Sequence, residues 1–192
     1  MSLGISLQAL VDRAMSLASV NLNTDPQALS MVTEDVLINV FQDVGIALAA
    51  SRDTRKLLRV SQNVIFANGS VTLPVGILTQ YANEGTLQDA TDSTTIVKRY
   101  SYEPEWAEFI RQWDQRIGYW TVQQYTIYVT EPNATYDPTT GLSETRLFTC
   151  PTIPQVPAVA GTIINYPDEV VTRLIIGTAN AIVGQSQVKV AA

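Results

Sequence analysis

The sequence predicts an α+β fold with a mainly antiparallel sheet. Apolar residues recur at helical spacing at both ends of the chain and alternate loosely in between. Strand-like segments follow one another in a run, which favours helices and strands that are segregated along the chain. We expect an N-terminal helical hairpin or bundle, a β region with a short inserted helix, a C-terminal helix and a flexible tail. These parts form a single domain over residues 1–192. The helical part is residues 1–51, the β-rich part 52–166, the closing helix 167–184 and the tail 185–192.

The N-terminal part is predicted to hold two helices. Leu7, Leu10 and Ala14 recur at helical spacing, and Ser6 stands where a helix cap is needed. The second helix is expected to begin at Asp25-Pro26, because a proline at the first helical position loses no hydrogen bond. Its apolar stripe continues to about Ser51. Such a long helix often packs against a neighbour, in the same chain or in another.

The β region is predicted to open with a hairpin. Asn68-Gly69 lies between two apolar runs, and both residues tolerate the positive φ of a tight turn. The second arm ends at Leu73-Pro74, because proline cannot donate to a strand ladder. Residues 75–85 are a short helix or a loop. A polar loop and then a strand over Thr95–Tyr100 are expected to follow.

Further strands and a short helix complete the β region. Pro104 opens a helix with aromatic residues on one side, and residues 118–130 form the clearest strand. A turn-rich loop leads to a strand over residues 145–151. The proline-rich stretch 151–161 is expected to be extended and to lie at an edge. Asp168 then caps the closing helix.

Composition points to a protein with covered surfaces. Charged residues make up 16% of the chain, below the quarter or so that is usual, so we expect partner chains to cover part of the surface. The net charge of −6 argues against a general nucleic-acid binder. It is compatible with a surface that DNA slides past.

The chemistry of most enzyme sites is missing from the sequence. The chain has no histidine and one cysteine, which excludes Ser-His-Asp and Cys-His catalysis, histidine metal sites and cysteine-built zinc sites. No glycine-rich phosphate loop is present. We therefore expect no cofactor, no metal and no enzyme activity. Cys150 is interpreted as a small buried hydrophobe.

Carboxylates leave one catalytic alternative open. A pair of acids near tryptophans is typical of a glycan-cleaving cleft, and the alternative is an amphipathic helix with its acids facing water. The amphipathic helix is favoured. Asp89 and Asp92 are a possible cation site, but the sequence around them lacks the glycine and glutamate of a calcium loop, which favours a polar loop. The acids of the possible glycan-cleaving cleft are Glu103, Glu105, Glu108 and Asp114, which lie near Trp106 and Trp113 in the sequence.

Two features are candidate partner contacts. A basic cluster either touches DNA or an acidic partner, or is an exposed strand face after a helix end; the strand face is favoured. The proline-rich stretch could dock into a neighbour by pairing with a sheet edge. The contact residues predicted from these features are Arg52, Arg55, Lys56, Arg59, Pro154 and Pro157.

No membrane contact is expected. The longest apolar-rich segment, Val170–Gly184, is too short to span a bilayer and contains Arg173. The N-terminal residues lack the basic and apolar parts of a signal peptide. A product made in the cytoplasm is the default expectation.

The order of the parts resembles the head-to-tail adaptor proteins of tailed bacteriophages. A helical lead runs into a strand ending "VTLPVGIL", and the strand "IVKRYSY" follows. Next come "EWAEFIRQW" and "GYWTVQQYTIYV", and "INYPDEVV" opens the last helix. The resemblance covers roughly Asn63 to Val183 and departs from the commoner pattern by lacking further aromatics before the final helix.

The resemblance implies a structural role in the virion. Such adaptors form a ring, typically twelvefold, that joins the portal to the next neck or tail component and lets double-stranded DNA pass through its lumen without sequence-specific binding. The protein would be made in the host cytoplasm. From the surface argument we expect it to be monomeric at low concentration and to oligomerise on its portal, because ring interfaces of modest size need a template. A tail-completion or tail-terminator ring would share the same composition and is the alternative.

Overall fold

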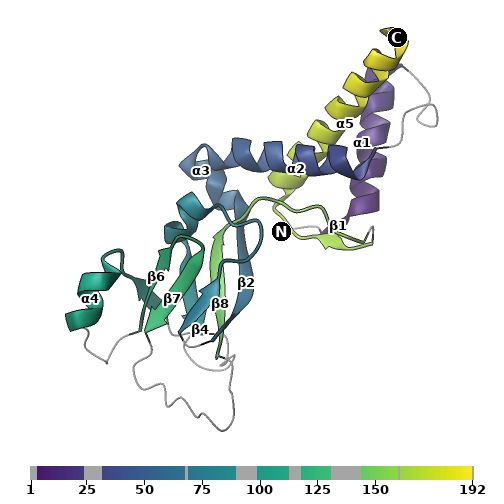
Figure 1. Cartoon of the computed structure of the whole chain (residues 1–192). Helices are drawn as coiled ribbons and strands as arrows, with labels where there is room; N and C mark the ends of the chain where they lie inside the picture. The colour runs from purple at the N-terminus through teal and green to yellow at the C-terminus, as the bar shows by residue number, and fades with distance from the viewer. Residues whose placement is uncertain are drawn as a thin grey trace. The chain divides into compact units, whose positions relative to one another are not determined.

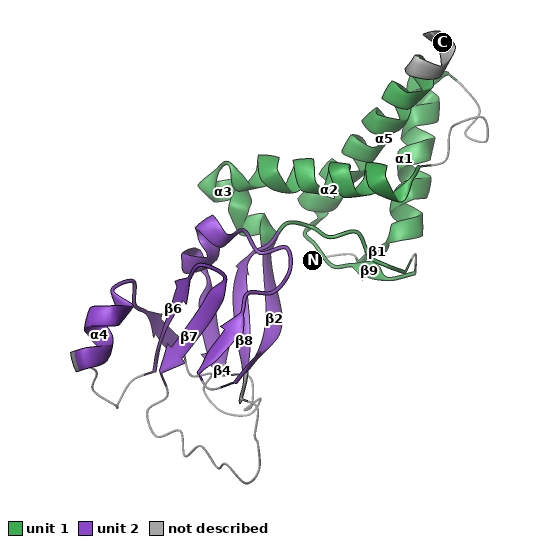
Figure 2. Ribbon diagram, viewed as in Figure 1, with its two compact units in different colours: residues 1–58, 153–192 green, residues 59–152 purple. Residues whose placement is uncertain are grey.

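The α+β prediction is confirmed. The computed structural model describes residues 4–23, 32–67, 69–89, 99–112, 118–130, 144–159 and 161–191. It combines helices with a mixed, mainly antiparallel sheet (Figure 1). We expected one domain. The structure groups the chain into two compact units (Figure 2), unit 1 formed by Met1–Leu58 with Ile153–Ala192 and unit 2 by Arg59–Thr152.

Unit 1 is a helical unit with a small strand pair. Residues Ile5 and Ser6 pair antiparallel with Ile164 and Ile163. In the helical part, α1 and α5 lie side by side and α2 crosses them (Figure 1). The elements are β1 (Ile5–Ser6), α1 (Leu7–Leu22), α2 (Glu34–Ala49), α3 (Arg52–Arg55), the 3-10 helix η2 (Lys56–Leu58), β9 (Ile163–Ile164) and α5 (Asp168–Ala191).

The first helix begins as predicted, and the second helix of the described residues begins at Glu34. Ser6 caps α1, and its Oγ accepts a hydrogen bond from the backbone N–H of Ala9 at 3.2 Å. The predicted start of the second helix at Asp25-Pro26 lies outside the described residues. Within them α2 begins at Glu34, because Thr33 is still extended and the acidic Glu34 and Asp35 suit the positive end of the helix dipole.

The closing helix is longer than predicted. The expected tail over residues 185–192 is wrong for the described part, since α5 continues to Ala191. No proline follows Gly184, and residues such as Gln185 and Ala191 are good helix formers. A single glycine weakens a helix but does not end it when the following residues favour the same backbone.

Unit 2 is built around one seven-stranded sheet. The strand order is β2-β8-β4-β5-β6-β7-β3, and within it β5 and β6 are the parallel pair. All other ladders of the sheet are antiparallel. The strands are β2 (Arg59–Phe66), β3 (Ser70–Thr72), β4 (Thr86–Asp89), β5 (Arg99–Tyr102), β6 (Tyr119–Gln123), β7 (Thr126–Thr130) and β8 (Glu144–Pro151).

Aromatic side chains form the centre of the unit 2 core. Trp120 and Phe148 are fully buried and meet edge to face, with ring centroids 5.4 Å apart. Tyr102 packs on the same indole at 5.0 Å. These rings come from β6, β8 and β5, so the core ties together strands that are distant in the sequence.

The predicted hairpin turn is present but its arms separate. Ala67 and Ser70 form an antiparallel bridge through two backbone hydrogen bonds, and Gly69 has a φ of 74°. Asn68 lies outside the described residues. Beyond the bridge, β2 pairs with β8 and β3 pairs with β7. In the strand order, β2 and β3 are therefore the first and the last strand of the sheet. The expectation of a hairpin ladder is therefore wrong beyond one bridge.

Two strand predictions in the middle of the chain are also wrong. The single strand expected over 118–130 is two strands, β6 and β7, joined by a turn at Gln124 and Tyr125. Gln124 adopts a positive φ of 54°, which could not be predicted because glutamine, unlike glycine or asparagine, is not typical of such a turn position. The polar loop expected from Thr86 instead starts with β4, which lies between β8 and β5.

Other predictions for unit 2 agree with the structure. Leu73-Pro74 follows the last residue of β3, and the segment after it contains the 3-10 helix η3 (Thr79–Glu84). The inserted helix α4 spans Trp106–Gln112, and the strand expected over 145–151 is part of β8. Cys150 is buried, as interpreted from the sequence.

Candidate interaction surface

The predicted basic cluster is not one exposed strand face. Its first three residues lie on α3 and η2, and Arg59 alone lies on a strand, β2. Arg55 is buried, whereas Arg52, Lys56 and Arg59 are exposed. The loose apolar alternation that follows Arg52 suggested a strand, but the chain first forms one short turn of helix.

Arg55 has a structural position at the end of α2. Its Nη1 donates to the carbonyl oxygen of Ala49 at 2.9 Å, and Thr54 Oγ1 donates to the carbonyl of Leu48 at 2.6 Å. The last carbonyls of a helix have no partner within the helix. Arg55 and Thr54 therefore supply hydrogen-bond donors to the last carbonyl groups of α2, so the Arg55 guanidinium is not available to an outside partner.

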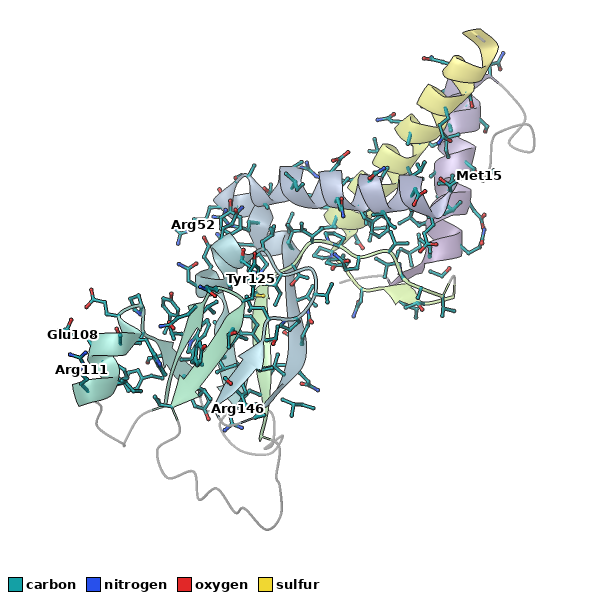
Figure 3. All side chains as sticks on the ribbon, in the orientation of Figure 1. Met15, Arg52, Glu108, Arg111, Tyr125 and Arg146 are labelled. Carbon is teal, nitrogen blue, oxygen red and sulfur yellow. The ribbon has the colours of Figure 1, made fainter. Side chains whose placement is uncertain are left out.

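Two of the remaining three cations of the cluster are held locally as well. Lys56 pairs with Asp53 at 3.4 Å, and both side chains are exposed. Arg59 donates to the carbonyl of Glu84. Arg52 is exposed on α3 (Figure 3). An exposed pair of this kind contributes little to stability, and one to three scattered cations are too few for strong binding to a phosphate backbone.

The two predicted proline contacts differ in their surroundings. Pro154 is buried against α2, where a Cβ on Gly45 would lie 3.0 Å from Pro154 Cδ and 2.9 Å from Ile153 Cγ2. Pro157 is half-buried. The stretch 153–157 has no regular secondary structure and rests on a helix, so the expectation that it lies at a sheet edge is corrected.

The candidate acids do not converge on one point. Glu105 and Glu108 are exposed, and Glu108 and Arg111 stand on the outer side of α4 (Figure 3). Glu103 precedes the helix and its Oε1 accepts from the backbone N–H of Glu105 at 3.4 Å. Asp114, Trp113 and Asp92 lie outside the described residues, as does the Asp89 side chain. Among the described residues, no three metal-ligating side chains gather to hold an ion.

The aromatic side of α4 faces its own unit. Phe109 meets Tyr119 edge to face with centroids 4.5 Å apart, and Trp106 lies 6.0 Å from Phe109. Ile110 on the same helix is exposed. Glu105 and Glu108 thus face water and two of the aromatics face the sheet, so the described part of α4 has the amphipathic arrangement.

Burial governs the one thiol of the chain. Desolvation raises the pKa of Cys150 to about 11, although a side-chain hydrogen bond with Thr152 and the charge of Arg59 lower it. A buried thiol that stays protonated is a weak nucleophile and a poor metal ligand. Cys150 therefore belongs to the core of unit 2.

A charge-free surface covers the α1–α5 pair. Residues 14–24 and 174–188 contain no Asp, Glu, Lys or Arg. In the described part of these stretches three large aliphatic side chains are exposed, although the surface of a helix usually carries charges there. We call them the helix-pair surface: Leu17, Val20 and Ile176, which are 36%, 76% and 45% exposed.

A second charge-free surface lies in unit 2. The Leu73 N–H donates to the Tyr125 carbonyl at 2.8 Å, so the loop after β3 and the β6–β7 turn lie side by side. Val75 in that loop is 84% exposed and Tyr125 is 68% exposed. We call Val75 and Tyr125 the apolar tip. Residues 60–83 and 117–130, which contain them, carry no Asp, Glu, Lys or Arg.

Both surfaces were missed in reasoning from motifs. The signal was present as uncharged stretches of sequence, but uncharged segments are also what a buried core produces. Only exposure separates the two cases, and exposure depends on which neighbours the fold supplies.

Comparison with known proteins adds no identification. A scan against models of protein families finds no match, and a search of curated proteins finds none either. Over the part of the chain that the structure describes, none of the helices is long and apolar enough to cross a membrane.

Proposed function

We propose that the chain is a structural virion protein, a head-to-tail adaptor of a tailed bacteriophage. It forms a ring that joins the portal to the next neck or tail protein, and double-stranded DNA passes through the ring. The resemblance in the order of the sequence segments motivates this role. The proposal is about assembly and involves no catalytic step.

One observation carries the proposal. Each of the two units has its own exposed, uncharged apolar surface, the helix-pair surface in unit 1 and the apolar tip in unit 2. Exposed apolar patches are a common mark of protein contacts, and interface cores are depleted in charge. A connector needs contacts with more than one protein, and two separate surfaces provide for them.

The charge of the molecule supports passage of DNA without retention. The net charge is −6. In the predicted basic cluster Arg55 is buried at a helix end, and Lys56 and Arg59 have local partners. Arg52 alone is left exposed without a local contact among those described. Binding of DNA through its backbone requires cations that neutralise several phosphates. A ring of such chains would repel the duplex weakly and would not hold it.

Electron microscopy of the purified protein mixed with the portal of the same phage tests the proposal. A ring coaxial with the portal is the expected result. A protein that binds the tail-tube protein and stops tube growth, but does not bind portal, would be a tail-terminator, and the adaptor role would be rejected. A protein that binds none of these virion components would reject both roles.

A further inference from the structure

The interior of the α1–α5 pair is thin along its charge-free part. The buried cluster there consists of three alanines and one isoleucine: Ala14, Ala18, Ala179 and Ile182. Alanine lets two helices approach closely but buries little apolar area, and stabilisation scales at about 25 cal/mol per Å² buried. Among the described residues, the buried cluster at this end of the pair is therefore small.

Larger aliphatic side chains lie around this small core and are only partly covered by the described residues. Met15 on α1 (Figure 3) and Ile175 on α5 are half-buried, as are the others that pack on the cluster. The three residues of the helix-pair surface are exposed beyond them. In a complete helix bundle such side chains would face a further helix. The half-buried set is Met15, Leu22, Val32, Ile175 and Val183.

We propose that the helix pair of a second copy of this chain supplies the missing helices. In the assembly, the α1 face with Leu17 and Val20 packs on the α5 face with Ile176 of the next copy. This inference rests on the proposed function, because it names the contact through which the ring forms. It assigns subunit association to unit 1 and leaves the apolar tip for another protein.

Charge favours a second copy as the occupant. Two chains with a net charge of −6 repel each other, and the repulsion is smallest where neither carries an ionised side chain. Residues 14–24 and 174–188 are such stretches. Within these stretches nucleic acid finds no cation and a strongly charged protein finds no counter-charge; the exposed Arg13 and Arg173 lie just before them, one helical turn from Leu17 and from Ile176. An uncharged aliphatic helix face is what fits, and the chain itself has one on each of the two helices.

The two faces belong to different helices, so the contact is head-to-tail. Leu17 and Val20 are three residues apart and share one face of α1, whereas Ile176 lies on α5. A contact between two different patches leaves one patch open on each partner, and repeated addition gives a ring if the rotation closes. A self-complementary contact would stop at a dimer.

Two single substitutions and their mixture test the contact. Val20→Glu blocks the α1 face and Ile176→Glu blocks the α5 face, while glutamate keeps good helix propensity. The matched control is Ile46→Glu on α2, where the isoleucine is 58% exposed and the added charge is the same. Circular dichroism and thermal unfolding verify that all three variants fold. Sedimentation velocity over a concentration series, with and without the portal, measures association.

The proposal expects wild type and Ile46→Glu to associate and each blocked variant alone to remain monomeric. A mixture of the two blocked variants should form one-to-one dimers and go no further, because one intact α1 face meets one intact α5 face. Association of folded Val20→Glu or Ile176→Glu at wild-type concentrations would overturn it. So would monomers in the mixture, or loss of association in Ile46→Glu.

The same experiment separates this inference from the proposed function. Blocked variants that still form rings on the portal would overturn the helix contact and leave the adaptor role standing. A wild-type protein that associates through these faces but never binds portal or another virion protein would overturn the adaptor role and leave the helix contact standing. A wild type that stays monomeric under every condition would overturn both.

Discussion

At the scale of single residues, buried polar groups divide into those with partners and one without. Thr152 is buried and its Oγ1 donates to the carbonyl oxygen of Cys150 at 3.2 Å. Thr178 on α5 is fully buried, and its Oγ1 has no hydrogen-bond partner in the described part of the chain. A buried hydroxyl without a partner loses its hydration and gains nothing in return.

Replacing Thr178 by valine should stabilise the protein by about 1 kcal/mol, because the shape is kept and the cost of the unsatisfied hydroxyl is removed. Urea unfolding of the variant measures the gain. Thr152→Val is the control and should not stabilise, since it deletes a hydrogen bond that the fold uses. Equal effects at both positions would show that the Thr178 hydroxyl is satisfied in solution.

The Cys150 thiol makes stability depend on pH at the alkaline end. Its pKa is about 11 in the fold and 9.0 as an ordinary thiol. Between these values the unfolded chain releases a proton that the folded chain keeps, so stability falls as the pH rises. The loss should reach about 2 kcal/mol near pH 10.5, with full stability retained below about pH 8.

Unfolding at pH 8 and at pH 10.5 measures this loss, and Cys150→Ala should remove most of it. Tyr166, whose pKa burial raises from 10.0 to about 12, keeps a smaller slope at the upper end of the range. An unchanged slope in the alanine variant would assign the pH dependence to other groups.

At the scale of elements, the helix end between α2 and η2 shows what the basic residues do. Arg55 and Thr54 bond the carbonyls of Ala49 and Leu48, so α3 serves as a C-terminal cap for α2. Arg52 is three residues away on the same short helix and is exposed. Arg52 and Arg55 are the same residue type, but they are expected to contribute differently to the free energy of unfolding.

Arg55→Ala should destabilise the protein by about 2 to 3 kcal/mol, since a buried charged hydrogen bond is lost and a helix-end carbonyl is left uncapped. Arg52→Ala should change stability by less than about 0.5 kcal/mol, as exposed substitutions do. Thermal unfolding of both variants measures the difference. Equal, small effects would restore the interpretation of Arg55 as a contact residue.

The elements also show how far sequence reasoning reaches. Helix α1 with its Ser6 cap and strand β8 were predictable, because periodicity and capping act within a few residues. The β6–β7 turn was not, because Gln124 takes a positive φ without a glycine or asparagine to signal it. Strand β4 was not predictable either, since its polar residues become a strand through pairing with β8, far along the sequence.

The candidate contact residues show the same limit. A cluster of cations is visible in the sequence, but which of them is buried depends on the carbonyls that the fold places nearby. Arg55 was therefore predicted as a contact and is a helix cap. The helix-pair surface and the apolar tip are recognised from the exposure of their residues in the fold. The low charge content of the sequence indicated that some surface is covered by partners, but not where that surface lies.

At the scale of the whole molecule, the two units differ in their continuity along the chain. Unit 2 is the unbroken segment Arg59–Thr152, and the complete seven-stranded sheet lies within it. Its core is its own, with Trp120, Phe148 and Leu87 fully buried among the strands. Unit 1 is assembled from both ends of the chain and holds unit 2 as an insertion.

A fragment containing residues 59–152 should therefore fold without the rest of the chain. All ladders of its sheet and all members of its aromatic core are present, and a domain of this length is large enough to fold alone. We expect dispersed amide resonances, a tryptophan signal in near-UV circular dichroism and one cooperative melting transition. Phe148→Ala in the same fragment is the control, because removing a buried aromatic ring costs about 3 to 5 kcal/mol and should abolish the transition. A fragment that stays unfolded while the intact chain melts cooperatively would mean that the helical unit is required for the sheet to form.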